Sequence, residues 1–369
     1  MAGSLSDLWA GAPELPDLVA SADARAIFET DLYGAVPPPP DNVTWSAVEK
    51  QGFTQLDITC AANGGTLTVS VGLWLPKTGH PAPLVAALDF SGPFGIVPQG
   101  QFALDPNARV YSEPKWQADG HLTAAMAGQF AYRWPVEMIT EAGFAVMVSC
   151  YGSWVPDHPE LWRQHGVSPL LGGPDTGAFS LWAWALMRMV DVAVQLPQID
   201  SEAIAVAGHS RLGKTALWAG VNDPRIAAVW ANNSGCAGAA PARHPVGETL
   251  QQLHSRFPHW LRKGAVITPD DLSSDQHQLL ALCAPRGVYL SEADDDQWAD
   301  PLGSYFSLTQ SSSAWGQEPR AWPDVESLFG TTRAHRNGAL GYHMRQGGHD
   351  MLAEDWAQVL PFLTEVFGD

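Results

Sequence analysis

The segment from Gly208 to Lys214, which reads Gly-His-Ser-Arg-Leu-Gly-Lys, constrains the fold of this chain more than any other. A short apolar run, Ala203–Ala207, precedes it, and a run of small residues with helical character, Thr215–Ala219, follows it. This order predicts a buried strand, a sharp turn with a serine in it, and a helix. The flanking glycines matter because a larger side chain would block so tight a turn.

Strands and helices alternate along the rest of the chain. Period-two or short apolar runs predict strands at 66–75, 84–90, 145–150, 226–231, 287–290 and 340–344, and helical spacing predicts helices at 179–196 and 352–367. Strands interleaved with helices imply a mostly parallel sheet that is covered on both faces. In such sheets ligands bind beyond the carboxyl ends of the strands, and Ser210 lies at such an end.

The 369 residues are enough to bury a large core. We expect a single domain over residues 1–369, with residues 1–50 as an N-terminal extension packed on it. Two segments, at about 91–133 and 299–338, follow predicted strands and look rich in loops. We expect both of them to build walls around a site.

The formal net charge is −19, which disfavours nucleic acid and anionic membrane surfaces as partners. No apolar run reaches transmembrane length. Residues Met1–Pro13 lack the basic and apolar regions of a signal peptide, so the chain is expected to be either cytoplasmic or a mature form. We expect a monomer.

Cofactor motifs are absent from the sequence. The four cysteines form no C-x-x-C pair and are expected to be buried free thiols, at Cys60, Cys150, Cys236 and Cys283. There is no H-E-x-x-H or other metal-ligand cluster, no G-x-G-x-x-G and no phosphate-binding loop. We therefore expect neither a metal nor a nucleotide cofactor.

A serine at such a turn suits nucleophilic catalysis if a base and an orienting acid complete the site. In α/β-hydrolases the chain order is serine, acid, histidine. His349 follows the last predicted strand and precedes the last helix, where the base belongs, and His343 inside the strand is the competing candidate. The acid should follow strand 287–290, where chain order leaves open Asp294, Asp295 and Asp296.

The turn G-x-S-R-x-G-K resembles that of the glucuronoyl esterases, carbohydrate esterase family 15. Other segments are similar to bacterial members of that family, at 133–137, 179–184, 232–236, 247–249, 257–260, 275–277, 296–301 and 341–350. The resemblance covers roughly residues 50–369. It implies an α/β-hydrolase fold, a three-layer α/β/α sandwich, and a secreted or periplasmic enzyme. It also implies hydrolysis of esters between 4-O-methyl-glucuronic acid on xylan and alcohols of lignin.

The resemblance also implies roles for individual residues. Ser210 corresponds to the nucleophile, His349 to the general base, and Arg211 to the arginine that stabilises the oxyanion. Contacts with the sugar hydroxyls or the uronate are implied for Lys214, Glu248 and Trp298. The structural alternatives are that the two cations only solvate a helix, that Glu248 begins a helix, and that Trp298 only packs.

Two departures from the fungal pattern bear on the site. Fungal relatives carry the catalytic acid as a glutamate where this chain has Asn233, so the acid must come from elsewhere. Some bacterial members use an aspartate two residues before the tryptophan, which is Asp296 here, and we predict that residue. His209 stands where fungal members have a half-cystine, so the chain lacks that disulfide.

Three functions fit this pattern. The leading hypothesis is a serine esterase that hydrolyses glucuronoyl esters through an acyl-enzyme. An acetyl-xylan or general carboxylesterase is the near alternative, although Arg211, Lys214 and Trp298 favour a uronate because an acetyl group offers no hydroxyls to grip. A catalytically inactive protein of hydrolase fold that only binds carbohydrate is the third.

Overall fold

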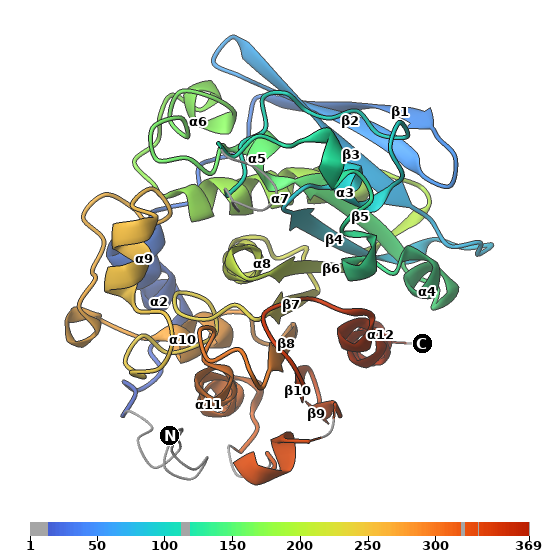
Figure 1. Ribbon diagram of the computed structural model, residues 1–369. Helices are drawn as coiled ribbons and strands as arrows, with labels where there is room; N and C mark the ends of the chain where they lie inside the picture. Colours follow the sequence, from blue (N-terminus) through green and yellow to red (C-terminus); the bar gives the residue numbers. More distant parts are fainter. Residues whose placement is uncertain (1–13, 112–118, 319–321, 331, 369) are drawn as a thin grey trace.

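The computed structural model describes residues 14–111, 119–318, 322–330 and 332–368. The prediction for Met1–Pro13 lies outside these residues. Within them the strands form one ten-stranded sheet (Figure 1). Across the sheet its order is β1 (Asn42–Glu49), β2 (Thr54–Ala62), β3 (Gly65–Trp74), β5 (Ala145–Cys150), β4 (Ala82–Asp89), β6 (Ile199–His209), β7 (Ala228–Asn232), β8 (Gly287–Ala293), β10 (Leu340–Arg345) and β9 (His335–Asn337).

The central strands are parallel. All pairings from β5 through β4, β6, β7 and β8 to β10 are parallel, whereas β1, β2 and β3 at one edge and β9 at the other pair antiparallel. Because parallel strands carry their carboxyl ends at the same edge, the residues that follow β6, β7, β8 and β10 gather there. The mostly parallel sheet predicted from the sequence is confirmed.

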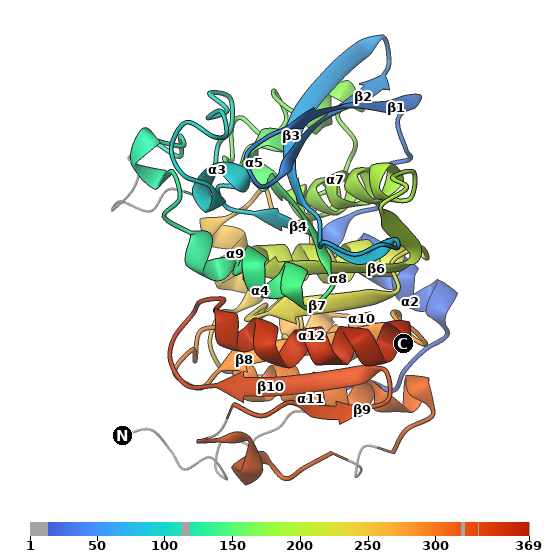
Figure 2. The same cartoon turned by 90° about the vertical axis from the view of Figure 1, so that its right-hand side faces the viewer.

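Helices cover both faces of the sheet, which gives three layers (Figures 1 and 2). One face carries α7 (Ala178–Ala193), α8 (Arg211–Asn222), α10 (Gln276–Ala281) and α11 (Pro301–Ser311), and the other carries α4 (Val136–Glu141) and α12 (Ala353–Phe367). The shorter helices are α2 (Ser21–Phe28), which runs into a π-helical turn at Glu29–Tyr33, α3 (Pro93–Ile96), α5 (Tyr151–Trp154), α6 (Val167–Leu170) and α9 (Leu250–Arg256). Single 3₁₀ turns lie at Ala124–Met126, Ala131–Arg133, Pro269–Asp271, Ser312–Trp315 and Val325–Leu328.

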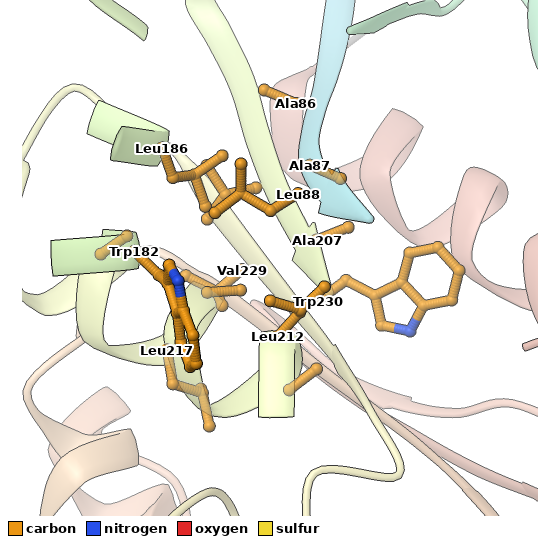
Figure 3. Close-up of a cluster of buried hydrophobic side chains, with 14 of the residues drawn as sticks. Ala86, Ala87, Leu88, Trp182, Leu186, Ala207, Leu212, Leu217, Val229 and Trp230 are labelled. Carbon is orange, nitrogen blue, oxygen red and sulfur yellow. The ribbon is translucent and has the colours of Figure 1, made fainter. Parts of the chain in front are cut away.

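Alternate residues of the central strands fill the two cores. On β7, Val229 lies on the side of Leu217, while Trp230 points to the opposite face (Figure 3). There the Trp230 ring meets Trp356 of α12 edge-on, with centroids 4.6 Å apart. Because helices cover both faces of the sheet, every residue of β7 is buried. A strand buried on both faces is apolar at successive positions, which explains the continuous apolar runs in the sequence.

Two sequence expectations need correction. Residues 42–49 of the expected N-terminal extension form β1 and belong to the sheet, although every residue of this strand is exposed or half-buried. Residues 299–338 were expected to be loop-rich, but they contain α11 and β9. Asp300 caps α11 and Pro301 begins it, while Ser, Thr and Gln in the helix obscure its apolar face.

The described parts of 91–133 contain only α3 and two 3₁₀ turns. Other expectations are confirmed. All seven predicted strands, counting 203–207, overlap observed ones. The four cysteines are buried and free. Among the described residues, no helix combines the length and the apolar character needed to span a membrane.

Candidate active site

Ser210 lies at the junction between β6 and α8. Its backbone has φ 59° and ψ −126°, a conformation that non-glycine residues adopt rarely and that is often found at functional sites. A Cβ atom at Gly208 would lie 2.0 Å from the carbonyl oxygen of Leu212, so only glycine fits two residues before the serine. A Cβ at Gly213 would lie 3.0 Å from the carbonyl of Gly208, which explains why the second glycine stands three residues after the serine.

Most of the predicted site residues line one cavity of about 240 Å³ at this turn. They are Ser210, Arg211, Lys214, Glu248, Trp298 and His349, and Asp296 is buried behind His349. A larger cavity, of about 490 Å³, is lined by none of the predicted site residues. The structure therefore brings together predicted site residues from four separate segments of the chain.

His349 is paired with one of the three candidate acids. Its Nδ1 lies 2.5 Å from Oδ2 of Asp296, a carboxylate that is 4% exposed. Asp294 instead accepts a hydrogen bond from the backbone N–H of Gly347 at 2.8 Å, and Asp295 is exposed. A histidine held through Nδ1 by a buried carboxylate presents Nε2 for proton transfer.

His343, the competing histidine, is fully buried away from the cavity. Its Nε2 lies 2.8 Å from Oδ1 of Asp355, and its Nδ1 lies 2.8 Å from the hydroxyl of Tyr289. Its neighbour Arg345 has a structural task that the sequence did not reveal. The guanidinium also contacts Asp355 and donates to the carbonyls of the loop that carries His349, at Gln346, Gly348 and Asp350.

Asn233, which the family resemblance matches to the fungal glutamate, contacts Asp296, the predicted acid. Its Nδ2 donates to Oδ2 of Asp296 at 2.7 Å. A neutral donor at this point stabilises the ionised carboxylate, whereas a second carboxylate would repel it. Asn233 thus stabilises the Asp296 carboxylate as a hydrogen-bond donor and is not itself an acid.

Lys214 and Glu248 form a buried pair on the cavity wall. The Lys214 ammonium donates to the carbonyl oxygens of Ser234 at 2.7 Å and Cys236 at 2.5 Å, and to Oε2 of Glu248 at 3.1 Å. These contacts use all three N–H donors of the Lys214 ammonium. Within this pair, the remaining acceptor positions on the Glu248 carboxylate are therefore the ones that can bind a ligand. Glu248 does not begin α9, because Thr249 caps that helix in a capping box.

Trp298 lies at the edge of the cavity with 41% of its surface exposed. The guanidinium of Arg256 lies 5.5 Å from its ring centroid. An exposed aromatic face next to a cavity provides a flat apolar surface against which a sugar ring can pack. Packing against the core alone does not account for this exposure.

His209 lies against His349, the predicted base. Its ring centroid is 4.6 Å from that of His349, and its Nδ1 lies 2.5 Å from Oδ1 of Asn232. Burial lowers the pKa of His209 well below its usual value, and the positive charge that His349 can carry lowers it further. At neutral pH His209 is therefore uncharged.

The described residues contain no group of three or more His, Cys, Asp or Glu side chains able to hold a metal ion. The chemistry available from these residues is nucleophilic and acid–base. A serine, a histidine held by a buried aspartate, and an arginine beside the serine are the groups that ester hydrolysis through an acyl-enzyme requires.

Known proteins share both sequence and structure with this chain. Residues 168–317 match the family model described as fungal glucuronyl esterase. A carbohydrate esterase from an unknown prokaryotic organism is 35% identical over 366 residues, which cover 92% of this chain and 82% of that protein. A 4-O-methyl-glucuronoyl methylesterase from Phanerochaete chrysosporium is 28% identical over 89% of this chain, which spans 61% of that protein.

Solved structures agree with this relationship. A promiscuous CE15 esterase from a marine bacterial metagenome superposes with a TM-score of 0.81 at 27% identity, covering 96% of this chain and 97% of that one. A glucuronoyl esterase from Solibacter usitatus gives a TM-score of 0.80 at 27% identity, covering 97% and 98%. These matches confirm the α/β-hydrolase fold. The chain belongs to carbohydrate esterase family 15, the glucuronoyl esterases, and is a carboxylic ester hydrolase.

Proposed function

We propose that this enzyme hydrolyses esters of glucuronic acid or 4-O-methyl-glucuronic acid, with Ser210 as the nucleophile. The observation that carries the proposal is the short contact between His349 and Asp296 at the cavity that holds Ser210. His349 takes the proton of the Ser210 hydroxyl as the oxygen attacks the ester carbonyl. Asp296 stabilises the imidazolium that forms.

The tetrahedral intermediate carries negative charge on the former carbonyl oxygen. Arg211 borders the cavity immediately after Ser210 and supplies a cationic donor, and the first backbone amides of α8 have no partner within the helix. Loss of one oxyanion donor typically raises the barrier by about 2.7–4 kcal/mol. The intermediate collapses by expelling the alcohol, which takes the proton from His349. Water activated by His349 then releases the uronate from Ser210.

The Lys214–Glu248 pair and the exposed ring of Trp298 favour a substrate whose acyl group is a sugar acid. Glu248 accepts hydrogen bonds from sugar hydroxyls while Lys214 holds the carboxylate in place, and the ring of Trp298 packs against the sugar. An acetyl ester has no hydroxyls for Glu248 and no ring for Trp298. We therefore favour hydrolysis of glucuronoyl esters over hydrolysis of acetyl esters and over carbohydrate binding without catalysis.

The test compares hydrolysis of benzyl glucuronate with that of a small acetyl ester, with the Ser210→Ala variant as the blank. A strong preference for the glucuronoyl ester that disappears in Ser210→Ala supports the proposal. A preference for the acetyl ester would reduce Glu248 and Trp298 to structural roles. Activity on neither ester, together with binding of glucuronate, would favour a protein that only binds carbohydrate.

A glucuronoxylan substrate linked to lignin lies outside cells, so we propose a secreted or periplasmic location for the enzyme. Fractionation of cells that express the native gene would test this, and recovery only in the cytoplasm would contradict it. We also propose that the enzyme is a monomer. Sedimentation equilibrium at the assay concentration would test the monomer.

A further inference from the structure

Asp157 is a buried carboxylate that follows α5, beyond the carboxyl end of β5. Its side chain is 1% exposed and accepts four hydrogen bonds. Oδ1 accepts from Nε2 of His259 at 2.8 Å and from Nε1 of Trp260 at 2.7 Å. Oδ2 accepts from the hydroxyl of Tyr151 at 2.6 Å and from a terminal nitrogen of Arg211 at 2.8 Å.

The contact with Asp157 leaves most of the Arg211 guanidinium available. Within the described residues, the bond to Asp157 is the one hydrogen bond that the Arg211 side chain makes, and its buried Nε has no partner. A guanidinium has five N–H donors. Because Arg211 also lines the active-site cavity, the donors that Asp157 does not occupy can serve an anion that forms there.

Aromatic rings confine the same guanidinium. The ring centroids of Trp260 and Tyr111 lie 4.5 Å and 4.6 Å from its central carbon. An arginine side chain in water samples many rotamers, and fixing it costs conformational entropy. Here the two rings restrict the movement of the Arg211 guanidinium, while Asp157 fixes one of its terminal nitrogens.

The charges of the two groups support each other. Burial alone would raise the pKa of Asp157, but the hydrogen bond from His259 and the charge of Arg211 lower it below the usual value. Burial opposes the charge on Arg211, but Tyr151 and Asp157 together raise its pKa. Both groups are therefore ionised at any pH at which the enzyme works.

We propose that Asp157 is a positioning residue, which holds the Arg211 guanidinium where the oxyanion forms. This inference rests on the function proposed above, in which Arg211 stabilises that oxyanion. Asp157 does not line the cavity but contacts two residues that do, Arg211 and Trp260, and in this proposal it affects the reaction through Arg211. An active-site arginine that is fixed before the reaction loses no freedom when negative charge appears.

The principal test is the Asp157→Asn variant, assayed with benzyl glucuronate. The asparagine has about the same volume but no charge, and only one of its side-chain atoms accepts hydrogen bonds. We expect kcat to fall by roughly 10–100-fold with KM within about threefold of the parent, because the lost contact matters most in the transition state. An unchanged kcat in a folded variant would overturn the proposal.

A double variant separates positioning from general damage. If Asp157 acts through Arg211, adding Asp157→Asn to Arg211→Ala should change kcat by less than about twofold. If the fold-losses of kcat in the two single variants multiply in the double variant, Asp157 acts through another group and the proposal is overturned. If Arg211→Ala alone leaves kcat unchanged, the oxyanion role of Arg211 in the proposed function fails, whatever Asp157 does.

The matched control is Asp223→Asn. Asp223 is also buried and paired with an arginine, Arg225, but it follows the far end of α8. This variant should lose thermal stability while kcat stays near the parent value, so a fall in kcat specific to Asp157→Asn is not a general effect of losing a buried carboxylate. If Asp157→Asn does not fold, Asp157→Glu keeps the charge but displaces it, and the same kcat and double-variant criteria apply.

Discussion

Asn233 donates a hydrogen bond to Oδ2 of Asp296 at 2.7 Å, and the same oxygen lies 2.5 Å from Nδ1 of His349. Asn233 follows β7 and Asp296 follows β8, which are neighbouring parallel strands. We propose Asp296 as the acid, which would place it one strand further along the sheet than the glutamate that the family resemblance gives to fungal relatives. The residue at the fungal position stabilises the new acid as a hydrogen-bond donor.

We predict that Asp296→Asn lowers kcat by about 10³–10⁴-fold and leaves the fold intact. An asparagine can favour the wrong tautomer of His349 and cannot stabilise the imidazolium, and the analogous change in a serine protease has an effect of this size. Steady-state kinetics with benzyl glucuronate measure the loss, and circular dichroism checks the fold.

Asp295→Asn is the matched control for this variant. Asp295 is exposed in the same acidic segment, and its side chain was among the candidates that chain order left open. Its replacement should leave kcat near the parent value. A large loss in Asp295→Asn, or full activity in Asp296→Asn, would mean that another carboxylate assists His349.

Placing a charge at Asn233 should change the pH dependence. In Asn233→Asp a second carboxylate stands beside Asp296, and added negative charge favours the protonated form of His349. Since the base must be neutral to act, the acidic limb of the kcat/KM profile should move to higher pH, by up to about 1 pH unit. The backbone at Asn233 has φ 46°, which aspartate also tolerates.

The Asn233→Ala variant distinguishes the effect of charge from the loss of the hydrogen bond. It removes the donor to Asp296 without adding a charge, so kcat should fall while the midpoint of the acidic limb stays in place. Identical midpoints in Asn233→Asp and the parent enzyme would show that the new group is protonated throughout, or does not interact with His349.

The residues that we propose as catalytic groups could be picked out in the sequence because Ser210 and His349 each lie beside a strong local signal. The apolar strand and the glycines mark Ser210, and the last strand and last helix bracket His349. The choice of Asp296 needed the family resemblance, since chain order left three aspartates open. The parallel sheet follows from the alternation of strands and helices, because the carboxyl ends of its strands must meet at one edge.

The supporting contacts could not be predicted, because they join residues that are far apart in sequence. Asp157 reaches Arg211 across 54 positions and His259 across 102. Their one sequence signal is that Asp157 follows a predicted strand, which many residues do. Strand β1 was missed for a different reason, since its apolar residues Val43 and Trp45 alternate with polar ones but none of the strand's residues is fully buried.

Glu248 should contribute to binding more than to the chemical step. We predict that Glu248→Gln raises KM for benzyl glucuronate by about tenfold, with a smaller effect on kcat, because one charge-assisted hydrogen bond to the sugar is weakened. The same variant should hardly change KM for a small acetyl ester, which has no hydroxyls. Equal increases for both substrates would show that Glu248 only holds Lys214 in place.

The buried Glu292 is expected to lower the stability of the folded protein at neutral pH, and the pH dependence of unfolding tests this. It lies on β8 with no exposed surface, and its carboxyl oxygens make no well-formed hydrogen bond among the described residues. Burial raises the pKa of Glu292 well above its usual value; the nearby Ser304 hydroxyl opposes this rise, and the carboxylates of Asp296 and Asp300 add to it. The folded protein therefore holds a proton on Glu292 that the unfolded chain releases above about pH 4.3.

This proton makes Glu292 unfavourable at neutral pH. The folded state binds more protons than the unfolded state, so stability falls by about 1.4 kcal/mol for each pH unit between the unfolded and the folded pKa. We predict that Glu292→Gln, which stays neutral and similar in shape, raises the melting temperature at pH 7–8 by several degrees but hardly changes it at pH 4. Thermal unfolding across this range measures the difference, with the exposed Glu202→Gln as a control that should show none. A melting temperature that is lower at every pH would mean that the carboxyl group makes a contact that glutamine cannot reproduce.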